Sequence, residues 1–506
     1  MPLVMGLDFG TGSVRVGLVD LETRAILCER EAPYATAYPK LGWAEQSPLD
    51  WWDALGRAAR AVMAEVGPVP VEGIAVATTA STVVACRRDG TPLRPALLWM
   101  DCRAAAEAER TAESRHPVMA YSGGGDAAEW LVPKAMWMAG HDPAWAETEI
   151  VCECIDFINF RLTGRWVASR MNATCKWNYD SIAKRLPAEL YAEFGVPGLE
   201  ERLPGTVVPV GQAIDMLAPA AADHLGIAGR PIVAQGGIDA HIGVLGAGTV
   251  RPGDLLMICG TSVVFLFHMD QEMPVPGFWG PYPHALINDL WLVEGGQVAA
   301  GSILSWLSRD IFGLRTGDMP ALWDEAARRP VASTGLLLLD HFMGNRTPYR
   351  DPHLRGGILG LTVGHDRASI YRSAAESVAV ASATIVERIR ALGIPCNRIV
   401  GSGGFTKNPI WFKATIDALG APVSLPDNSN LTIMGTAAAA ATAAGLFPDL
   451  TAASDGVARV GRTIDPDRTT HSRYRELMTE YHDATTLLAP TMRRLAAHPE
   501  RHADVG

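Results

Sequence analysis

The sequence opens with two short apolar runs, LVMGLDF at residues 3–9 and VRVGLVDL at residues 14–21, joined by Gly10-Thr11-Gly12-Ser13. Runs of this length, rich in valine and leucine and separated by a glycine turn, predict a β-hairpin. The pattern returns far downstream, where DLLMIC (254–259) and VVFLFH (263–268) flank Gly260-Thr261-Ser262. One such unit opens each half of the chain, which indicates an internal duplication.

The later parts of the two halves are also alike. PIVAQGG (231–237) and RIVGSGG (398–404) each run from an apolar strand into paired glycines, followed by an amphipathic stretch. Strands alternate with helical segments such as residues 48–65 and 370–392, which predicts two α/β lobes. The Gly- and Pro-rich connection GAGTVRP (246–252) marks the boundary, so we expect domains of residues 1–248 and 249–506.

Composition narrows the class of protein. The 506 residues are 48% hydrophobic and 20% charged, as in soluble globular proteins. A net charge of −11 with scattered basic residues disfavours a nucleic-acid or acidic-membrane partner. There is no signal-peptide pattern, and the alanine-rich run Thr436 to Leu446 is too weakly hydrophobic to span a membrane. We therefore expect a cytoplasmic protein.

The metal-ligating residue types form no strong pattern. Eight cysteines without CxxC spacing indicate reduced, mostly buried thiols. Cys152 and Cys154 would share a face if they lay on one strand, which would allow a metal site, but buried thiols are the simpler interpretation. His498 and His502 lie in a charged tail that we interpret as solvated.

The Gly-Thr-Gly-Ser turn offers backbone amides and hydroxyls without bulk, as a phosphate chain requires. An ordinary tight turn is the alternative for one such loop, but the second copy favours phosphate binding. Asp8 would hold a divalent cation through water. The chain lacks GxxxxGK[ST], a dinucleotide fingerprint with its following helix, and the protein-kinase HRD and DFG motifs. A two-lobed nucleotide clamp is the remaining option.

Five segments together resemble the FGGY carbohydrate kinases, in the order found in that family. They are Asp8-Phe9-Gly10-Thr11-Gly12-Ser13-Val14-Arg15, Asp239-Ala240-His241, Gly260-Thr261-Ser262, Glu294-Gly295-Gly296-Gln297 and Gly403-Gly404. The resemblance covers nearly the whole chain. It implies two actin-like (ribonuclease H-like) ATPase lobes with a deep interdomain cleft in which ATP and sugar meet. The second signature of the family is matched by residues 356–361, whereas the first survives only as Lys134 and Trp137.

The resemblance also implies roles for individual residues. Asp239 would be the general base that takes the proton of the attacking sugar hydroxyl. The nucleotide would be bound by Asp8, Gly10, Thr11, Gly12, Ser13, Arg15, Gly260, Thr261, Ser262, Gly301, Gly403, Gly404 and Asn408, with Mg²⁺ held at Asp8 through water. Besides Asp239, the substrate would contact Ala80, Ser81, Asp101, Lys176 and Glu294. His241 would orient Asp239 or pack in a helix turn.

The implied reaction is ATP- and Mg²⁺-dependent phosphorylation of the terminal hydroxyl of a ketopentose. Ile238-Asp239-Ala240-His241, Lys176 and Glu294 resemble the ribulokinase-like members, so ribulose is the first choice. Xylulose is the second, and glycerol, a tetrose or another polyol remain alternatives. An actin-like nucleotide clamp of the chaperone or filament type and a sugar-sensing pseudokinase are alternatives of a different class. A homodimer is the default expectation for assembly.

Overall fold

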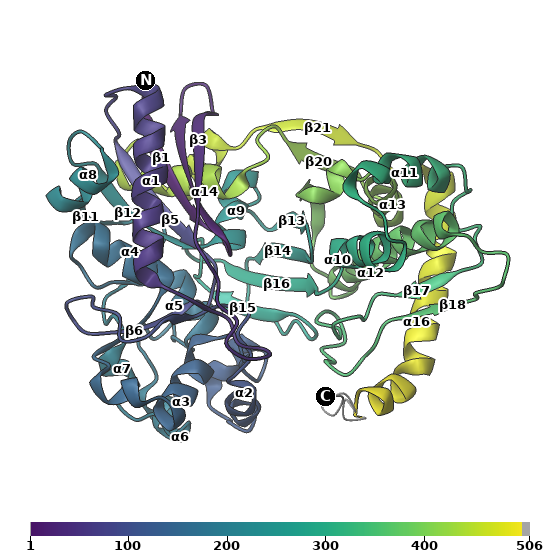
Figure 1. The fold of residues 1–506 in the computed structure, drawn as a ribbon, viewed down its shortest axis with the longest axis horizontal. Coiled ribbons are helices and arrows are strands. Elements are labelled where there is room, and N and C mark those ends of the chain that lie inside the picture. Colours follow the sequence, from purple (N-terminus) through teal and green to yellow (C-terminus); the bar gives the residue numbers. More distant parts are fainter. Residues whose placement is uncertain (1, 498–506) are drawn as a thin grey trace.

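The computed structural model describes residues 2–497, which form two lobes side by side (Figure 1). Each lobe is built on one large mixed sheet, with strand order β11-β12-β5-β1-β2-β3 in the first and β15-β16-β14-β13-β19-β20-β21 in the second. The first sheet contains β1 (Leu3–Phe9), β2 (Ser13–Asp20), β3 (Ala25–Pro33), β5 (Gly73–Thr78), β11 (Ala213–Met216) and β12 (Ile232–Ile238). The second contains β13 (Gly253–Cys259), β14 (Val263–Met269), β15 (Trp279–Pro283), β16 (Trp291–Gln297), β19 (Cys396–Ser402), β20 (Val423–Pro426) and β21 (Val460–Ile464).

The internal duplication is confirmed by the pairing of the strands. In the first lobe β1 pairs antiparallel with β2 and parallel with β5. In the second lobe β13 pairs antiparallel with β14 and parallel with β19. Both predicted hairpins are present, and their strand ends match the expected ones to within one residue.

Helices cover both sheets. Those of the first half are α1 (Pro48–Val66), α2 (Ala105–Thr111), α3 (Leu131–His141), α4 (Cys154–Thr163), α5 (Arg170–Lys176), α6 (Ala188–Glu193), α7 (Leu199–Arg202), α8 (Pro219–Leu225) and α9 (Asp239–Ala247). Those of the second half are α10 (Gly301–Trp306), α11 (Met319–Ala327), α12 (Arg367–Ala391), α13 (Pro409–Leu419), α14 (Leu431–Ala443), α15 (Leu450–Val457) and α16 (Arg468–Ala496). The sequence predicts helices at residues 48–65, 370–392 and 472–497, and all three are present. Helices α12 and α16 begin a few residues earlier than expected because Asp366 and Asp467 cap them.

A smaller subdomain is formed by the chain between β5 and β12 together with β4, which precedes β5. Its four-stranded sheet has the order β4-β7-β6-β8, formed by β4 (Glu45–Gln46), β6 (Val83–Cys86), β7 (Ala96–Leu97) and β8 (Ile150–Glu153). Its own core is packed around Leu131, Trp177 and Tyr191. Because β8 ends at Glu153, Cys154 lies on α4 rather than on a strand with Cys152, so the alternation suggested for these two thiols does not hold. All eight cysteines are free. His498 and His502 lie outside the described residues.

Helix α14 belongs to the second half of the sequence but packs on the first lobe, against α9 and strands β1, β5 and β12 (Figure 1). Its alanines 437–441 are completely buried. The alanine-rich run is therefore an internal packing helix. No helix within residues 2–497 is both long enough and apolar enough to cross a membrane.

Helix α9 is buried on nearly all sides, so the amphipathic stretch expected after Gly236-Gly237 is wrong. It packs against α14, α15 and strands of both large sheets, so only its first two residues are partly exposed. The two helices approach closely because glycines meet the opposing backbone. A Cβ atom on Gly246 would overlap the Leu431 carbonyl oxygen, and one on Gly435 would overlap the Ile242 carbonyl oxygen.

This close approach predicts an unusual sensitivity to a single methyl group. We expect Gly435→Ala to destabilise the protein by about 1–3 kcal/mol, because the new Cβ forces the α9 and α14 backbones apart. Gly140→Ala is the matched control, since Gly140 is also helical and a Cβ there meets nothing within 4 Å. It should leave stability unchanged or raise it by up to about 1 kcal/mol. Thermal unfolding of both variants measures the difference, and equal midpoints would contradict tight packing.

Candidate functional site

The first glycine hairpin carries an ion pair at its tip. Asp8 and Arg15 are directly opposite each other in the β1–β2 ladder, and Arg15 Nη1 lies 3.0 Å from Asp8 Oδ2. Asp8 is only 4% exposed. Burial raises the pKa of its carboxyl to about 6, and the charge of Arg15 opposes that rise. Asp8 therefore takes up a proton far more readily than a solvated aspartate does.

Side chains from outside the Gly10–Ser13 loop fix its conformation by hydrogen bonds. The Tyr34 hydroxyl donates to the carbonyls of Gly10 and Ser13, and Gln46 Nε2 donates to the Thr11 carbonyl at 2.6 Å. Trp99 Nε1 donates to Thr11 Oγ1 at 3.0 Å. A Cβ on Gly12 would meet nothing within 4 Å, so the far side of the loop is open. The Ser13 hydroxyl is hydrogen-bonded to Glu31 and is less free than expected.

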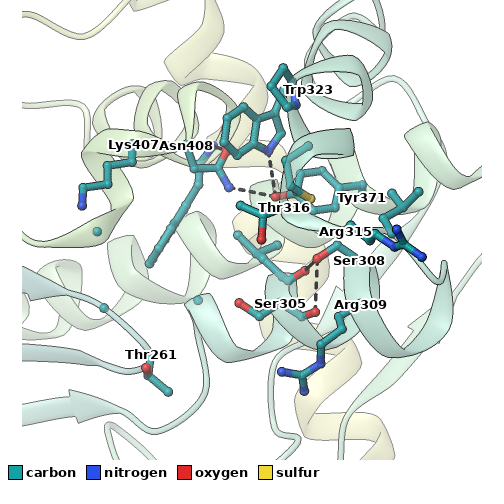
Figure 2. Close-up of a pocket in the computed structure, with 18 residues that line it drawn as sticks. Thr261, Ser305, Ser308, Arg309, Arg315, Thr316, Trp323, Tyr371, Lys407 and Asn408 are labelled. Atoms are coloured by element: carbon teal, nitrogen blue, oxygen red, sulfur yellow. Dashed lines mark hydrogen bonds between the residues drawn. The ribbon is translucent and has the colours of Figure 1, made fainter.

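The second hairpin turn is closed by Gly260 N donating to the Ser262 carbonyl at 2.8 Å. The start of α10 packs directly onto this turn, where Gly301 N donates to the Gly260 carbonyl at 3.1 Å. A Cβ on Gly301 would overlap that carbonyl, which explains the glycine. Thr261 faces a large pocket beside the turn (Figure 2).

This pocket has a volume of about 860 Å³ and lies within the second lobe (Figure 2). Five predicted nucleotide residues line it: Gly260, Thr261, Gly301, Gly404 and Asn408. Gly403 has a backbone role instead, since its φ of 103° turns the chain beside Cys259. Ser262 contributes its carbonyl to the hairpin turn.

Several pocket residues were not predicted from the sequence. Aromatic side chains form part of the wall, and the Tyr371 hydroxyl accepts hydrogen bonds from Asn408 Nδ2 at 2.8 Å and from Trp323 Nε1 at 3.1 Å. Lysine and arginine also line the pocket. The unpredicted lining includes Ser305, Ser308, Arg309, Arg315, Thr316, Trp323, Tyr371, Lys407 and Trp411. Helical periodicity would have suggested only that Tyr371 and Trp411 are buried; it gave no reason to bring them together.

Asp239 is the first residue of α9, directly after β12. Ile238 is the N-cap residue, so Asp239 does not cap the helix, although its Oδ1 accepts from Ala240 N at 2.7 Å. The side chain keeps part of its surface exposed, but dense surroundings and the nearby charge of Asp8 raise the pKa of its carboxyl to about 7. A carboxylate with that pKa accepts a proton easily near neutral pH.

Lys176 and Glu294 meet across the two lobes. Lys176 ends α5, Glu294 lies in β16, and Lys176 Nζ is 3.3 Å from Glu294 Oε2. His241 Nε2 lies 3.5 Å from the same oxygen. The nearby cationic side chain of Lys176 and the His241 ring hold the pKa of Glu294 well below its usual range despite burial. Both side chains of the ion pair are buried, so Lys176 is not a surface lysine.

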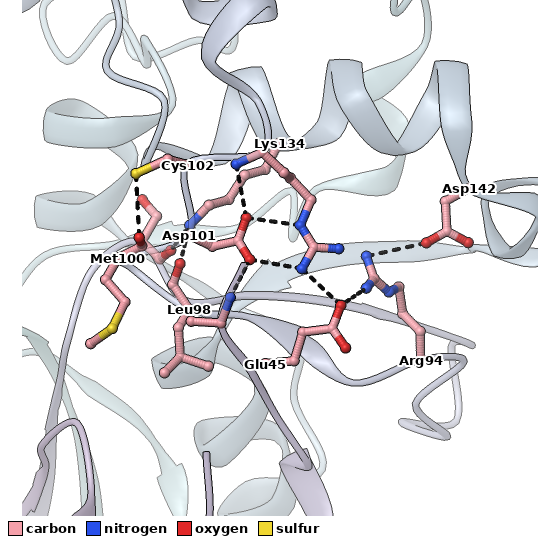
Figure 3. Close-up of polar contacts among 11 residues, drawn as sticks. Glu45, Arg94, Leu98, Met100, Asp101, Cys102, Lys134 and Asp142 are labelled. Carbon is pink, nitrogen blue, oxygen red and sulfur yellow. Dashed lines mark hydrogen bonds and ion pairs between the residues drawn. The ribbon is translucent and has the colours of Figure 1, made fainter. Parts of the chain in front are cut away.

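Two predicted substrate contacts have other partners. Asp101 is completely buried, and its carboxylate accepts from Arg103 at 2.7 and 2.8 Å and from Ala44 N at 2.7 Å. Figure 3 shows this network continuing through Glu45 to Arg94 and Asp142. With its oxygens engaged this way, Asp101 has a structural role, and the expectation that it faces the substrate is corrected.

Ser81 is likewise completely buried. Its hydroxyl donates to Glu153 Oε1 at 2.7 Å, and its carbonyl accepts from Lys134 Nζ at 2.7 Å. Lys134 also donates to the Leu98 carbonyl, and burial lowers the pKa of its ammonium group to about 8. Glu153 and Lys134 thus hold the Ala80-Ser81 turn from two sides. Ala80, which is partly exposed, is the member of this turn that remains available to a ligand.

Among the described residues, the carboxylates do not form a cluster that could bind a metal ion without other ligands. No group of three or more His, Cys, Asp or Glu side chains within residues 2–497 is placed to hold a metal ion. Mg²⁺ is commonly held by one or two carboxylates together with substrate phosphates and water. Asp8 beside an open glycine loop fits that mode, and does not fit a metal bound by protein alone.

Most of the chain is similar in sequence to known proteins. Residues 3–246 match the model of the N-terminal domain of the FGGY family of carbohydrate kinases, and residues 255–444 match that of its C-terminal domain. A ribulokinase from Mycolicibacterium smegmatis is 30% identical, with 99% of this chain and 98% of that protein covered. A human FGGY carbohydrate kinase domain-containing protein is 28% identical over 91% of this chain and 92% of its own. The crystal structure of a xylulose kinase from Rhodospirillum rubrum superposes with a TM-score of 0.86 at 27% identity, covering 97% and 100% of the two chains.

Proposed function

The chain belongs to the FGGY family of carbohydrate kinases and is a sugar kinase, and we propose that it transfers phosphate from ATP to the terminal hydroxyl of a ketopentose. Ribulose is the first choice and xylulose the second. The observation that carries this proposal is the buried Lys176–Glu294 pair, joined through His241 to the helix that begins with Asp239. A cation and a carboxylate side by side suit the carbonyl and hydroxyl groups of a sugar chain.

Asp239 is proposed as the general base. A sugar hydroxyl is a poor nucleophile, so a carboxylate in hydrogen-bond reach assists by accepting its proton as the bond to phosphorus forms. The raised pKa of Asp239, about 7, makes it a better proton acceptor than a solvated aspartate. Lys176, Glu294 and the Ala80 turn would fix the sugar so that its terminal hydroxyl faces Asp239.

The nucleotide is proposed to occupy the pocket of the second lobe. Trp323, Tyr371 and Trp411 supply the apolar wall that a purine ring prefers, and Gly260 and Thr261 of the second hairpin also line the pocket. The phosphates would lie on the two glycine hairpins, with Asp8 holding Mg²⁺ through water. Mg²⁺, when bound, would neutralise charge on the phosphates.

We further propose that residues 1–248 and 249–506 form the two functional domains. The two large sheets draw their strands from these separate halves, and the family matches end at residue 246 and begin again at residue 255. Membership of a family of carbohydrate kinases supports an enzyme over a chaperone or filament clamp and over a sugar-sensing pseudokinase. Glycerol, a tetrose or another polyol remain as rival acceptors to the ketopentose.

Replacing the base tests the mechanism. We expect Asp239→Asn to lower kcat by at least ~10²-fold, because the amide cannot take the hydroxyl proton. ATP binding, measured by calorimetry, should stay within about threefold of the unmodified protein, since the nucleotide pocket lies in the other lobe. A variant that keeps more than about a tenth of kcat would show that Asp239 is not the base.

The pH dependence offers an independent test. With both substrates far below saturation, the rate reports ionisations of the free enzyme. The active form has Asp239 ionised, so the rate should be constant above about pH 7 and fall as pH drops through that value. Protonation of Asp8 should steepen the fall below about pH 6. End-point measurement of ADP across this range checks the profile, and a rate that rises toward acid pH would contradict an ionised base.

The acceptor is identified by ADP release with D- and L-ribulose, D- and L-xylulose, erythrulose, glycerol and common polyols, each with and without Mg²⁺. We expect one ribulose isomer to give the highest kcat/KM, and activity to require Mg²⁺. A preference for glycerol or a tetrose would keep the kinase assignment and overturn the ketopentose.

A further inference from the structure

Three side chains near the Lys176–Glu294 pair have buried polar atoms without hydrogen-bond partners in the part of the chain that the structure describes. They are Asp126 through Oδ1, Tyr282 through its hydroxyl, and His241 through both ring nitrogens, although His241 remains within 3.5 Å of Glu294. Buried polar groups in proteins are nearly always satisfied, so a cluster of exceptions indicates a missing ligand or ordered water. The cluster draws on both lobes, since Tyr282 lies in β15 and Asp126 precedes α3.

The position of Asp126 is set by its second carboxylate oxygen. Asp126 Oδ2 accepts from Asn178 Nδ2 at 2.9 Å, and Asn178 follows Lys176 by two residues. On the other side, Trp130 lies four residues after Asp126, and its ring is 4.7 Å from Lys176 Nζ. Asn178 and Trp130 therefore place the segment that carries Asp126 close to Lys176.

The neighbours of Asp126 have their own hydrogen bonds. The Ser122 hydroxyl donates to the Met119 carbonyl at 3.0 Å but is near enough to lower the pKa of Asp126 as well, and Thr111 Oγ1 accepts from the backbone N of Asp126 at 2.9 Å. Asn178 donates to Oδ2. Among the described residues, Oδ1 makes no hydrogen bond within normal geometry, and Asp126 interacts electrostatically with Lys176 and Tyr282.

The charged groups between Asp239 and Asp126 form a series in which each is linked to the next by a contact or by adjacency in the chain. Asp239 begins α9, and His241 two residues later contacts Glu294. Glu294 pairs with Lys176, and Lys176 is followed by Asn178, which holds Asp126. The electrostatic couplings agree with this order, because the charge of Glu294 acts on Asp239 and that of Lys176 acts on Asp126. Asp126 and Asp239 therefore stand at opposite ends of the series.

We propose that Asp126 is a specificity-determining residue that binds the hydroxyl at the end of the sugar farthest from the phosphorylated one. This inference rests on the proposed function, because it takes Asp239 as the base at the reacting end. For a 2-ketopentose phosphorylated at its last carbon, the group read by Asp126 is the hydroxyl on C1. The Tyr282 hydroxyl is the neighbouring group that would donate to the same oxygen.

The charge balance indicates which chemical class fits. Glu294 pairs with the Lys176 ammonium group and is also under the influence of the Arg346 guanidinium group, and the charge of Lys176 acts on Asp126. A neutral polyol can donate hydroxyls to both carboxylates and accept from Lys176. The cluster therefore offers both donors and acceptors, as the hydroxyl and carbonyl groups of a ketose require.

The test compares two substrates that differ only at the distal end: the ketopentose that the enzyme prefers and its 1-deoxy analogue. The unmodified enzyme should favour the hydroxylated substrate in kcat/KM by ~10- to ~100-fold, the range for a hydrogen bond to a charged group. We expect Asp126→Ala to lose most of that factor for the hydroxylated substrate, mainly through KM, and to change the 1-deoxy analogue by less than about threefold. The ratio between the two substrates should collapse toward one.

Two further variants separate this role from a structural one. Asp126→Asn keeps an acceptor for Asn178 and should fold normally while losing part of the discrimination. Asp89→Asn, in an exposed turn of the same lobe, is the matched control and should leave both substrates unchanged. Sugar-induced shifts in the midpoint of thermal unfolding, measured without nucleotide, give a readout besides turnover.

The outcomes distinguish a failure of the Asp126 inference from a failure of the proposed kinase function. Equal losses on both substrates, or a ratio unchanged by Asp126→Ala in a folded protein, would overturn the role of Asp126 and leave the kinase intact. An unmodified enzyme that phosphorylates no ketose would instead overturn the proposed function itself.

Discussion

The backbone contact between α9 and α14 determines where the reactive groups of the two lobes meet. Gly246 and Gly435 allow the helices to approach until a carbonyl of one faces the bare α-carbon of the other. Helix α9 begins with Asp239, and α14 comes from the second half of the chain but rests on the strands that lead to Asp8. A helix of small residues thus ties the C-terminal half of the sequence to the sheet that presents both carboxylates.

Burial then shifts the pKa values of these carboxyl groups. Burial raises the pKa of Asp8, Asp126 and Asp239 to about 6 or 7, although the three lie on different elements. Glu294 is buried as well, but its pKa is lowered because Lys176 lies 3.3 Å away. Carboxyl groups are therefore prepared for different tasks by the balance between burial and nearby charge, since Arg15 only partly offsets the burial of Asp8 whereas Lys176 and His241 outweigh that of Glu294. A group that accepts a proton and a group that stays ionised can then serve one substrate.

The two glycine hairpins show how duplicated structure has acquired different chemistry. The first has Asp8 one residue before its strand ends, and Arg15 faces it across the ladder. The corresponding position in the second hairpin is Ile258, so that copy carries no charge at its tip. Its loop instead opens onto the large pocket through Gly260 and Thr261. Similar backbones thus present a hairpin with an ion pair from one lobe and an uncharged hairpin from the other.

The sequence by itself determined the local elements, because hairpins and helices are set by residues close together in the chain. The apolar periods, glycine turns and helix starts placed both hairpins and the long helices within a few residues, and the order of the motifs indicated the family. Tertiary structure alone decided which polar residues share a site. Asp101 matched a sugar-facing position by sequence but is held by Arg103 in the folded protein, whereas no sequence pattern marks Asp126, which the fold places against Asn178, two residues after Lys176. Partners separated by dozens of residues leave no periodic signal, so only the packing of the folded chain reveals them.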